Sequence, residues 1–160
     1  MFSGKLTILT EKDLDQILEI ETESFLQPWN RNMFLDELSS DNGQGYVVRE
    51  DPVINNKNPV AFIVFRLIAD EMHIFKIAVA QKWRQHKIGS WLLKKSFDIA
   101  VENHVSKILL EVRYSNNPAI ILYNRLGFQI VGRRPYYYSV PSYRLTGEDA
   151  LVMMKKIKGV

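Results

Sequence analysis

The sequence predicts an α/β domain with a mixed, mostly antiparallel sheet of about seven strands and about four helices. Short apolar runs of strand length alternate with longer stretches whose apolar residues recur at helical spacing. Three strand-like runs follow one another in the first half, which is typical of an antiparallel meander. The order strand, helix, strand between Glu71 and Val112 predicts one right-handed parallel crossover. Neither a doubly wound order nor a barrel fits.

The chain has 160 residues, which suits a single domain over residues 1–160. Its composition, 46% hydrophobic and 24% charged, excludes disordered and low-complexity classes. The absence of cysteine excludes disulfides and a cysteine nucleophile, and is typical of a reducing cytoplasm. A net charge of +3 suits an anionic ligand without requiring nucleic acid. Because no apolar run approaches the ~20 residues of a membrane helix, we expect a cytoplasmic protein with no membrane partner. With so modest a net charge, we also expect no direct nucleic-acid partner.

The first elements are a strand over Lys5–Leu9 and two helices. Thr10 and Asp13 have the spacing of a capping box, which starts the first helix. Pro28 and Trp29 interrupt this helix. The apolar positions of the first helix are Leu14, Ile17, Leu18 and Phe25; the second helix is capped by Asn30, carries Met33, Phe34 and Leu38, and ends before the turn at Asp41, Asn42 and Gly43.

The meander and the longest helix follow. The three runs are GYVVRE from Gly45, VAFIVFRLI from Val60 and EMHIFKIAV from Glu71. A helix is predicted over Ile88–Glu102, and KILLEV from Lys107 predicts a buried strand. The apolar stripe of the helix consists of Leu92, Leu93, Phe97, Ala100 and Val101.

A further helix, AIILYNRL, and two strands close the fold. Asn117 and Pro118 are predicted as its N-cap and first residue, and Gly127 as the residue after its end. The strands FQIVGRR from Phe128 and ALVMMKKI from Ala150 are joined by the aromatic loop PYYYSVPSYRLTGED.

Motif spacing excludes several reaction classes. His73, His86 and His104 lie far apart, so a histidine metal site has no local support and we expect no metal. The chain has no G-x-S-x-G, no P-loop and no G-x-G-x-x-G. An ordinary hydrogen-bonding role explains each histidine better.

The stretch AVAQKWRQHKIGSWLL indicates an anion site. A strand ends, a basic loop follows, and a helix begins near Ile88 with Gly89 in its first turn. A helix N-terminus offers unpaired N–H groups and partial positive charge, and glycine permits close approach of a ligand. A solvated basic turn before a surface helix would explain the same residues. The basic side chains are Lys82, Arg84, His86 and Lys87.

Nearly end to end, the chain resembles the GNAT superfamily of N-acetyltransferases, and within it the ribosomal-protein-alanine N-acetyltransferase (RimI-type) branch. The stretches that carry the resemblance are QPWNRNMFLDEL, FKIAV, RQHKIGSWLL, LLEVRYSN, AIILYNRLGF, and YYY with GEDALVM. The resemblance implies the GNAT (acyl-CoA N-acyltransferase) fold and acetyl-CoA as the acetyl donor.

The resemblance also implies where acetyl-CoA binds. Its pyrophosphate would lie on the loop and helix start, and its pantetheine arm would pair with the backbone of one strand, where two strands splay apart. The implied residues are Ile77, Ala78 and Val79 on the strand; Arg84, Gln85, His86, Lys87, Ile88, Gly89 and Ser90 on the loop and helix; and Asn116.

Lys87 departs from the family pattern, (Q/R)-x-x-G-x-(G/A), at the position of its first glycine. If this position needs a positive φ, a lysine costs on the order of 1 kcal/mol or more. Alternatively, a lysine here could place its ammonium against a phosphate.

Glu111 and Tyr123 are the candidate catalytic residues. Acetyl transfer to an amine needs a base for the amine and a proton for the departing thiolate. Glu111 stands in the apolar run ILLEV, and desolvation strengthens a carboxylate as a base. Tyr123 lies among apolar helix residues and could supply the proton. A surface carboxylate and a core tyrosine are the structural alternatives, but both positions coincide with the base and acid that the resemblance implies.

The acceptor implied by the resemblance is the N-terminal α-amine of a protein, in this branch the alanine of a ribosomal protein. Trp29, Tyr137 and Tyr138 would line the peptide groove, unless the tyrosines only pack over the sheet edge. A lysine side chain, polyamine or other small amine is the alternative acceptor, and a non-catalytic acyl-CoA-binding module is a third reading. The sequence does not set the oligomeric state.

Overall fold

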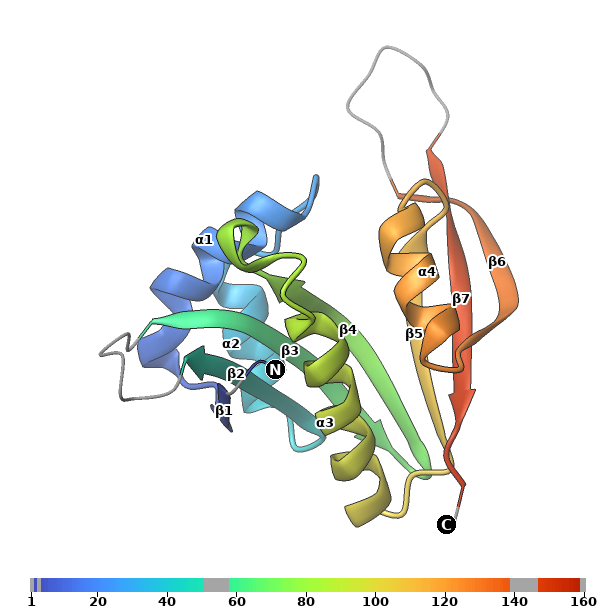
Figure 1. Cartoon of the computed structure of the whole chain (residues 1–160), viewed down its shortest axis with the longest axis horizontal. Coiled ribbons are helices and arrows are strands. Elements are labelled where there is room, and N and C mark those ends of the chain that lie inside the picture. The colour runs from blue at the N-terminus through green and yellow to red at the C-terminus, as the bar shows by residue number, and fades with distance from the viewer. Residues whose placement is uncertain (1, 3, 51–57, 139–146, 159–160) are drawn as a thin grey trace.

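A seven-stranded sheet in the order β1-β2-β3-β4-β5-β7-β6 forms the centre of the protein (Figure 1). The computed structural model describes residues 2, 4–50, 58–138 and 147–158. Neighbouring strands are antiparallel except β4 and β5, which are parallel. The predicted mixed, mostly antiparallel sheet is therefore confirmed.

The elements occur in the predicted order. The strands are β1 (Gly4–Ile8), β2 (Gly43–Glu50), β3 (Pro59–Ile68), β4 (Glu71–Val79), β5 (Lys107–Arg113), β6 (Gln129–Tyr138) and β7 (Glu148–Lys156). The helices of the described residues are α1 (Leu14–Ser24), α2 (Arg31–Ser39), α3 (Ile88–Glu102) and α4 (Asn117–Arg125), with 3₁₀ turns η1 (Glu11–Asp13) and η3 (Gln81–Trp83). None of these helices is long and apolar enough to cross a membrane.

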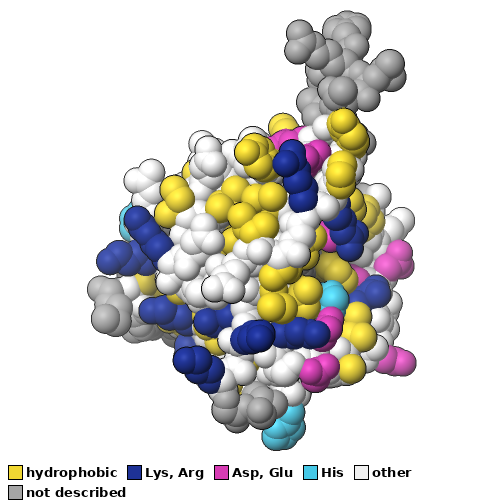
Figure 2. Space-filling view, turned by 90° about the vertical axis from the view of Figure 1, so that its right-hand side faces the viewer, with side chains coloured by type: hydrophobic (Ala, Val, Ile, Leu, Met, Phe, Trp, Pro, Cys, Tyr) yellow, Lys and Arg dark blue, Asp and Glu magenta, His cyan; other side chains and the backbone are white. Residues whose placement is uncertain are grey.

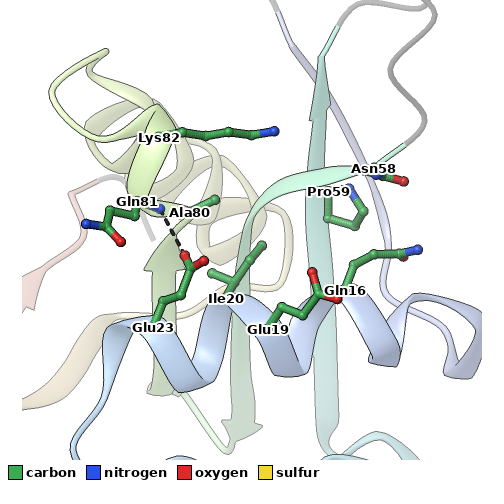
Figure 3. A pocket seen from close by; sticks show the side chains of 9 residues that line it. All are labelled: Gln16, Glu19, Ile20, Glu23, Asn58, Pro59, Ala80, Gln81 and Lys82. Carbon is green, nitrogen blue, oxygen red and sulfur yellow. Dashed lines mark hydrogen bonds between the residues drawn. The ribbon is translucent and has the colours of Figure 1, made fainter.

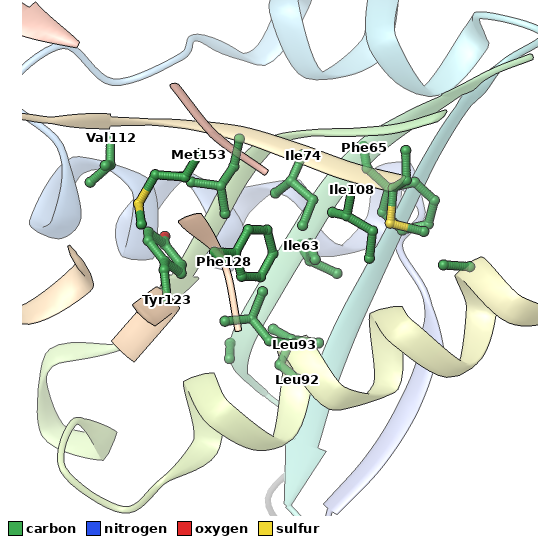
Figure 4. Packing of buried hydrophobic residues seen from close by; sticks show 14 of the residues in the cluster. Ile63, Phe65, Ile74, Leu92, Leu93, Ile108, Val112, Tyr123, Phe128 and Met153 are labelled. Atoms are coloured by element: carbon green, nitrogen blue, oxygen red, sulfur yellow. The ribbon is translucent and has the colours of Figure 1, made fainter. Parts of the chain in front are cut away.

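Helices cover the two faces of the sheet unequally (Figure 1). On one face, α3 and α4 pack on a core that includes Leu92, Ile108 and Met153 (Figure 4). On the other face, α1 and α2 pack through a second core, which includes Ile17, Phe34, Val47, Phe62 and Ala78 and draws its strand residues from β2, β3 and β4. This leaves the β5-β7-β6 half without a helix on that second face among the described elements.

The sheet edge at β6 is exposed. Figure 2 faces this side and shows hydrophobic side chains in patches among Lys and Arg. Ile130 and Val131 of β6 are each about half exposed. β6 continues through Tyr138, four residues into the stretch predicted as a loop, because Tyr138 pairs with Glu148 of β7. Residues 139–146 of that predicted loop lie outside the described residues.

Side-chain caps begin two of the helices. Asn30 caps α2, as predicted, by accepting a hydrogen bond from the Met33 N–H at 3.0 Å. The N-cap of α4 is Asn116, not Asn117 as predicted, because the Asn116 Oδ1 accepts from the Ala119 N–H at 3.3 Å. Asn117 is the first helical residue instead.

Two apolar positions differ from the prediction. Phe25 is extended, with φ −128°, and follows α1 rather than belonging to it. Val101 is 46% exposed, although the predicted stripe includes it. Gly127 follows α4 with φ +88°, which confirms its predicted place, since glycine adopts this conformation without steric cost.

A β-bulge at Phe75 changes which face β4 presents. Val64 of β3 lies opposite Lys76, and Phe65 lies opposite Ile74, so Phe75 is the extra residue. Ile74 packs in the core beneath α3. Strict alternation would send Lys76 to the same side, but the bulge turns Lys76 toward α1, where it meets Glu21.

We predict that Gly43→Ala destabilises the protein by about 2–3 kcal/mol, because overpacking of a tight site costs that much. An added Cβ would lie 1.9 Å from the Glu37 backbone oxygen at the end of α2. The matched control is Gly132→Ala, whose Cβ would lie 3.6 Å from the nearest atom, on Val152. Urea unfolding should show a loss for Gly43→Ala and a change within about 0.5 kcal/mol for the control. Equal stabilities would contradict the prediction.

Candidate active site

The parallel strands β4 and β5 pair over only four residues each, Glu71–Ile74 against Lys107–Leu110. Beyond this point β4 stays paired with β3 as far as Val79, and β5 stays paired with β7 as far as Arg113. The two strands therefore part, as Figure 1 shows. A cleft of about 850 Å³ opens between them, bordered by the loop before α3, the start of α3, and α4.

Most of the predicted site residues line this cleft. They are Ile77, Ala78, Val79, Arg84, Gln85, Lys87, Ile88, Gly89, Ser90, Glu111, Asn116, Tyr123 and Tyr138. Three do not line it. His86 faces its own loop, with Nδ1 2.8 Å from the Arg84 backbone oxygen. Trp29 packs against Phe34 and Phe75, and Tyr137 packs against Tyr138.

Several lining residues were not among the predicted ones. Phe25 and Leu26 come from the link Phe25–Asn30 between α1 and α2. Phe75 comes from the bulge, and Arg113 comes from β5. The position of Arg113, two residues after Glu111 on the same strand face, was a usable signal. The bulge leaves no such signal in the sequence.

The loop before α3 is shaped by left-handed residues. Gln85 has φ +66°, and Lys87, the N-cap residue of α3, has φ +62°. The first N–H groups of α3 have no partner within the helix and border the cleft. Gly89 adds room there, because a Cβ would stand 3.5 Å from Leu122 and 3.7 Å from Val79. These features together fit an anionic group.

Arg84 is bonded within the protein. Its Nε donates to the Val79 backbone oxygen at 3.1 Å, and its Nη2 donates to the Ser24 hydroxyl at 3.0 Å. Arg84 therefore ties the loop to both β4 and α1. Lys87 is exposed, and in the described part of the chain its ammonium has no ion-pair partner.

A second, smaller hollow of about 510 Å³ lies between α1 and the end of β4 (Figure 3). There the Glu23 Oε2 accepts a hydrogen bond from the Gln81 N–H at 3.2 Å. The hollow is lined by Gln16, Glu19, Ile20, Glu23, Asn58, Pro59, Ala80, Gln81 and Lys82. It contains none of the residues implied to bind acetyl-CoA or to catalyse transfer, so the larger cleft is the candidate active site.

Tyr123 enters the cleft from α4 with its ring buried in the core (Figure 4). Its ring centroid lies 5.7 Å from that of Phe128. Burial raises the pKa of the Tyr123 hydroxyl far above its ordinary value. The phenol therefore keeps its proton at physiological pH.

Glu111 lies on the opposite wall, in a more polar setting than its apolar sequence neighbours predict. Ile108 and Leu110 alternate into the core, whereas the Glu111 side chain is 25% exposed. Its Oε1 lies 3.0 Å from the Arg134 Nε, and it also forms a hydrogen bond with Tyr137. Both partners come from β6, far along the chain, so the local sequence gives no sign of them.

Arg113 organises the same wall. Its Nη1 donates to the Glu148 Oε2 at 3.1 Å, and its guanidinium lies 4.2 Å from the ring centroid of Tyr138. The other oxygen of Glu148 accepts from the Ser115 N–H at 2.7 Å. Burial, together with the charge of Glu111, raises the pKa of Tyr138 to about 12. Both tyrosines of the cleft are therefore neutral at physiological pH.

Comparison with known proteins identifies the fold and the activity. The profile described as Acetyltransferase (GNAT) family matches residues 14–128. The chain belongs to this family. GNAT acetyltransferases use acetyl-CoA, so the protein is an acetyl-CoA-dependent N-acetyltransferase. This sets aside the non-catalytic module. Among the described residues of this GNAT enzyme, no cluster of His, Asp and Glu could hold a metal ion.

Two relatives and two structures illustrate the match. The GNAT chain is 31% identical to the [ribosomal protein bS18]-alanine N-acetyltransferase of Escherichia coli (strain K12), over 92% of this chain and 94% of that protein. It is 32% identical to the enzyme of that name from Haemophilus influenzae, over 88% and 90%. The crystal structure of the Escherichia coli ribosomal-protein-S18-alanine N-acetyltransferase superposes with a TM-score of 0.86, at 26% identity, over 99% of this chain and 96% of that one.

The second structure shows the fold alone. Arabidopsis thaliana NAA60 in complex with acetyl-CoA has a TM-score of 0.83 at 17% identity, covering 98% of this chain and all of that one.

We predict that Lys87→Gly is more stable than Lys87→Ala by about 1 kcal/mol, because only glycine adopts φ +62° without steric cost. Both variants lose the ammonium equally, so their difference reports the backbone strain less the extra conformational entropy of glycine in the unfolded chain. Thermal unfolding of the two proteins provides the comparison. An alanine variant as stable as the glycine variant would show that the loop relaxes to another conformation.

Proposed function

We propose that this GNAT enzyme transfers the acetyl group of acetyl-CoA to the N-terminal α-amine of a protein, the alanine of a ribosomal protein. The observation that carries the proposal is the identity of 31–32%, over about nine-tenths of the chain, with enzymes named for alanine acetylation of ribosomal protein bS18. The cleft supports it independently, because a carboxylate and a buried phenol border the same space from β5 and α4.

The donor fits the cleft through backbone groups. In the described part of the chain, the edge of Ile77–Val79 that faces β5 has no strand partner, so this edge could pair with the amide groups of the pantetheine arm. The open N-terminus of α3, with Lys87 beside it, would hold the pyrophosphate. The same cleft is also lined by Gln85, Ser90 and Asn116.

Glu111 is proposed as the base. An N-terminal ammonium has a pKa near 7.7–8.0, against about 10.4 for lysine, so a carboxylate needs to supply only modest basicity. Glu111 would take the proton directly or through a water molecule. The Arg134 side chain, 57% exposed, is free to turn toward solvent when the acceptor's ammonium approaches the carboxylate.

Tyr123 is proposed as the acid. When the neutral amine attacks the thioester carbon, a bond forms between nitrogen and that carbon, the bond between the carbon and sulfur breaks and leaves a thiolate, and the nitrogen releases one further proton to solvent. Tyr123 donates its phenolic proton to this sulfur. Because apolar surroundings disfavour the charged forms of both thiol and phenol, the thiolate in the cleft is also a stronger base than in water.

The acceptor peptide is proposed to lie between the α1–α2 link and the end of β6. Tyr138 lines the cleft directly, while Trp29 and Tyr137 support its walls from behind. Glu148 forms an ion pair with Arg113, and Asp149 forms one with Arg133. Both carboxylates therefore stabilise the wall of the cleft and are not proposed to bind a basic residue of the substrate.

We further propose that residues 1–160 form one domain, since one sheet extends from β1 to β7. A ribosomal acceptor places the proposed activity in the cytoplasm.

We predict that Glu111→Gln and Tyr123→Phe each lower kcat by about tenfold or more, because each removes a proton-transfer group. The matched controls are Glu102→Gln and Tyr114→Phe, which change exposed residues outside the cleft. Steady-state kinetics with circular dichroism as a folding check provides the measurement. Full activity in either cleft variant would remove that residue's proposed role.

We also predict that the loss in Tyr123→Phe is the same at every pH from 6 to 9. A raised pKa means that the phenol is fully protonated throughout this range, so its contribution does not titrate there. The ratio of wild-type to variant kcat should therefore be flat. A ratio that falls toward 1 as pH rises to 9 would show that the phenol ionises.

The acceptor is tested with one peptide that carries a free N-terminal alanine and an internal lysine. After incubation with acetyl-CoA, fragment-ion mass spectrometry should find the acetyl group on the α-amine alone. Modification of lysine alone, or turnover only of spermidine, would overturn the N-terminal assignment and favour the alternative acceptors.

A further inference from the structure

A buried ion pair lies beneath the link that joins α1 to α2. The Lys76 Nζ is 2.6 Å from the Glu21 Oε1. The Lys76 side chain is 10% exposed and the Glu21 side chain is fully buried. Lys76 reaches this place only because the bulge at Phe75 turns it toward α1.

The pair contacts the link at both ends. The Glu21 Oε1 accepts a hydrogen bond from the Trp29 backbone N–H at 2.8 Å. The Lys76 ammonium lies 4.0 Å from the ring centroid of Phe25 and 5.2 Å from that of Trp29. Both distances are within the range of cation–π attraction, which is strongest for a cation removed from water. One lysine therefore holds two aromatic residues of the link at once.

The link forms the acceptor end of the cleft. Phe25 and Leu26 line it, next to Phe75, and Leu26 is 67% exposed. The Trp29 ring lies 6.4 Å from that of Phe75, so the link also packs against the bulge. A shift of the link would move this wall relative to Glu111 on the other side.

Stability alone does not account for a pair buried in this way. Among the residues that the structure describes, none forms a hydrogen bond with the Glu21 Oε2. Burial raises the pKa of Glu21 and lowers that of Lys76, which reports the cost of removing both charges from water. Apolar residues of similar volume are often as stabilising as a buried ion pair, or more so. The ion pair holds the link in a defined geometry, which an apolar contact at the same place would not do.

We infer that Lys76, together with Glu21, is a positioning pair that sets the link Phe25–Asn30 as the wall against which the acceptor peptide binds. This inference rests on the proposed function, because it assigns the wall to the peptide rather than to acetyl-CoA. Lys76 acts through Phe25 and Trp29 and does not itself touch the reacting atoms.

The test is the double variant Lys76→Met/Glu21→Gln. It removes both buried charges while nearly conserving volume, and glutamine still accepts the hydrogen bond from the Trp29 N–H. We expect unfolding at the wild-type temperature or above it, because no unpaired charge stays buried. We expect the KM for the alanine peptide to rise about tenfold, with the KM for acetyl-CoA within about twofold of wild type. Amide hydrogen exchange should be faster across residues 25–30.

The matched control is Asp13→Asn/Arg49→Met, which removes an ion pair at the other end of α1. Its peptide KM should match wild type, whatever its stability. If the first double variant fails to fold, Lys76→Gln/Glu21→Gln takes its place, because it too leaves no charge buried and keeps polar groups at both positions, with an expected rise in peptide KM of about threefold. An unchanged peptide KM in a folded variant would overturn the inference, even if hydrogen exchange were faster, since the pair would then be structural only.

Failure of the proposed function has a different signature. If wild-type protein leaves the alanine peptide unmodified, the peptide assignment falls before any variant is compared. The positioning role is then judged by hydrogen exchange across residues 25–30 and by the KM for whichever amine the wild type acetylates, a lysine peptide or spermidine. Unchanged values in both would overturn it.

Discussion

The early parting of β4 from β5 is the constraint on which the candidate site depends. A sheet normally satisfies its backbone groups with neighbouring strands, and an unpaired stretch within it needs other partners. Here four residues of each strand pair, and beyond them, among the described strands, β4 stays paired with β3 alone and β5 with β7 alone. The start of α3 and α4 both border the space between the two strands. The open edge of β4, Glu111 and Tyr123 therefore face one volume.

The bulge at Phe75 divides β4 into two parts with different tasks. Before it, Met72 and Ile74 belong to the core under α3. After it, Lys76 turns toward α1, while Ile77–Val79 border the cleft. One inserted residue thus lets a single strand serve as core, cleft wall and support for the α1–α2 link.

The order of elements was predictable because hydrophobic period and turn residues are local signals. The bounds of β4 and α3 agree with the prediction. The cap of α4 was misplaced by one residue because Asn116 and Asn117 are equally good caps, and only the hydrogen bond to Ala119 distinguishes them. Most of the residues that the family resemblance indicated line the cleft, but they make up less than half of its lining. The pairing of Glu111 with Arg134, and that of Glu21 with Lys76, depends on strand register and on a bulge, which no local pattern encodes.

Arg84 connects the loop before α3 to β4 and to the end of α1. Its guanidinium connects the loop proposed for the pyrophosphate to Val79 on β4 and to Ser24, the last residue before the proposed acceptor wall. Groups held in place before a ligand arrives lose little conformational entropy when it binds. If the proposed donor and acceptor sites are correct, the contacts of Arg84 would order part of both as the chain folds, before either substrate binds.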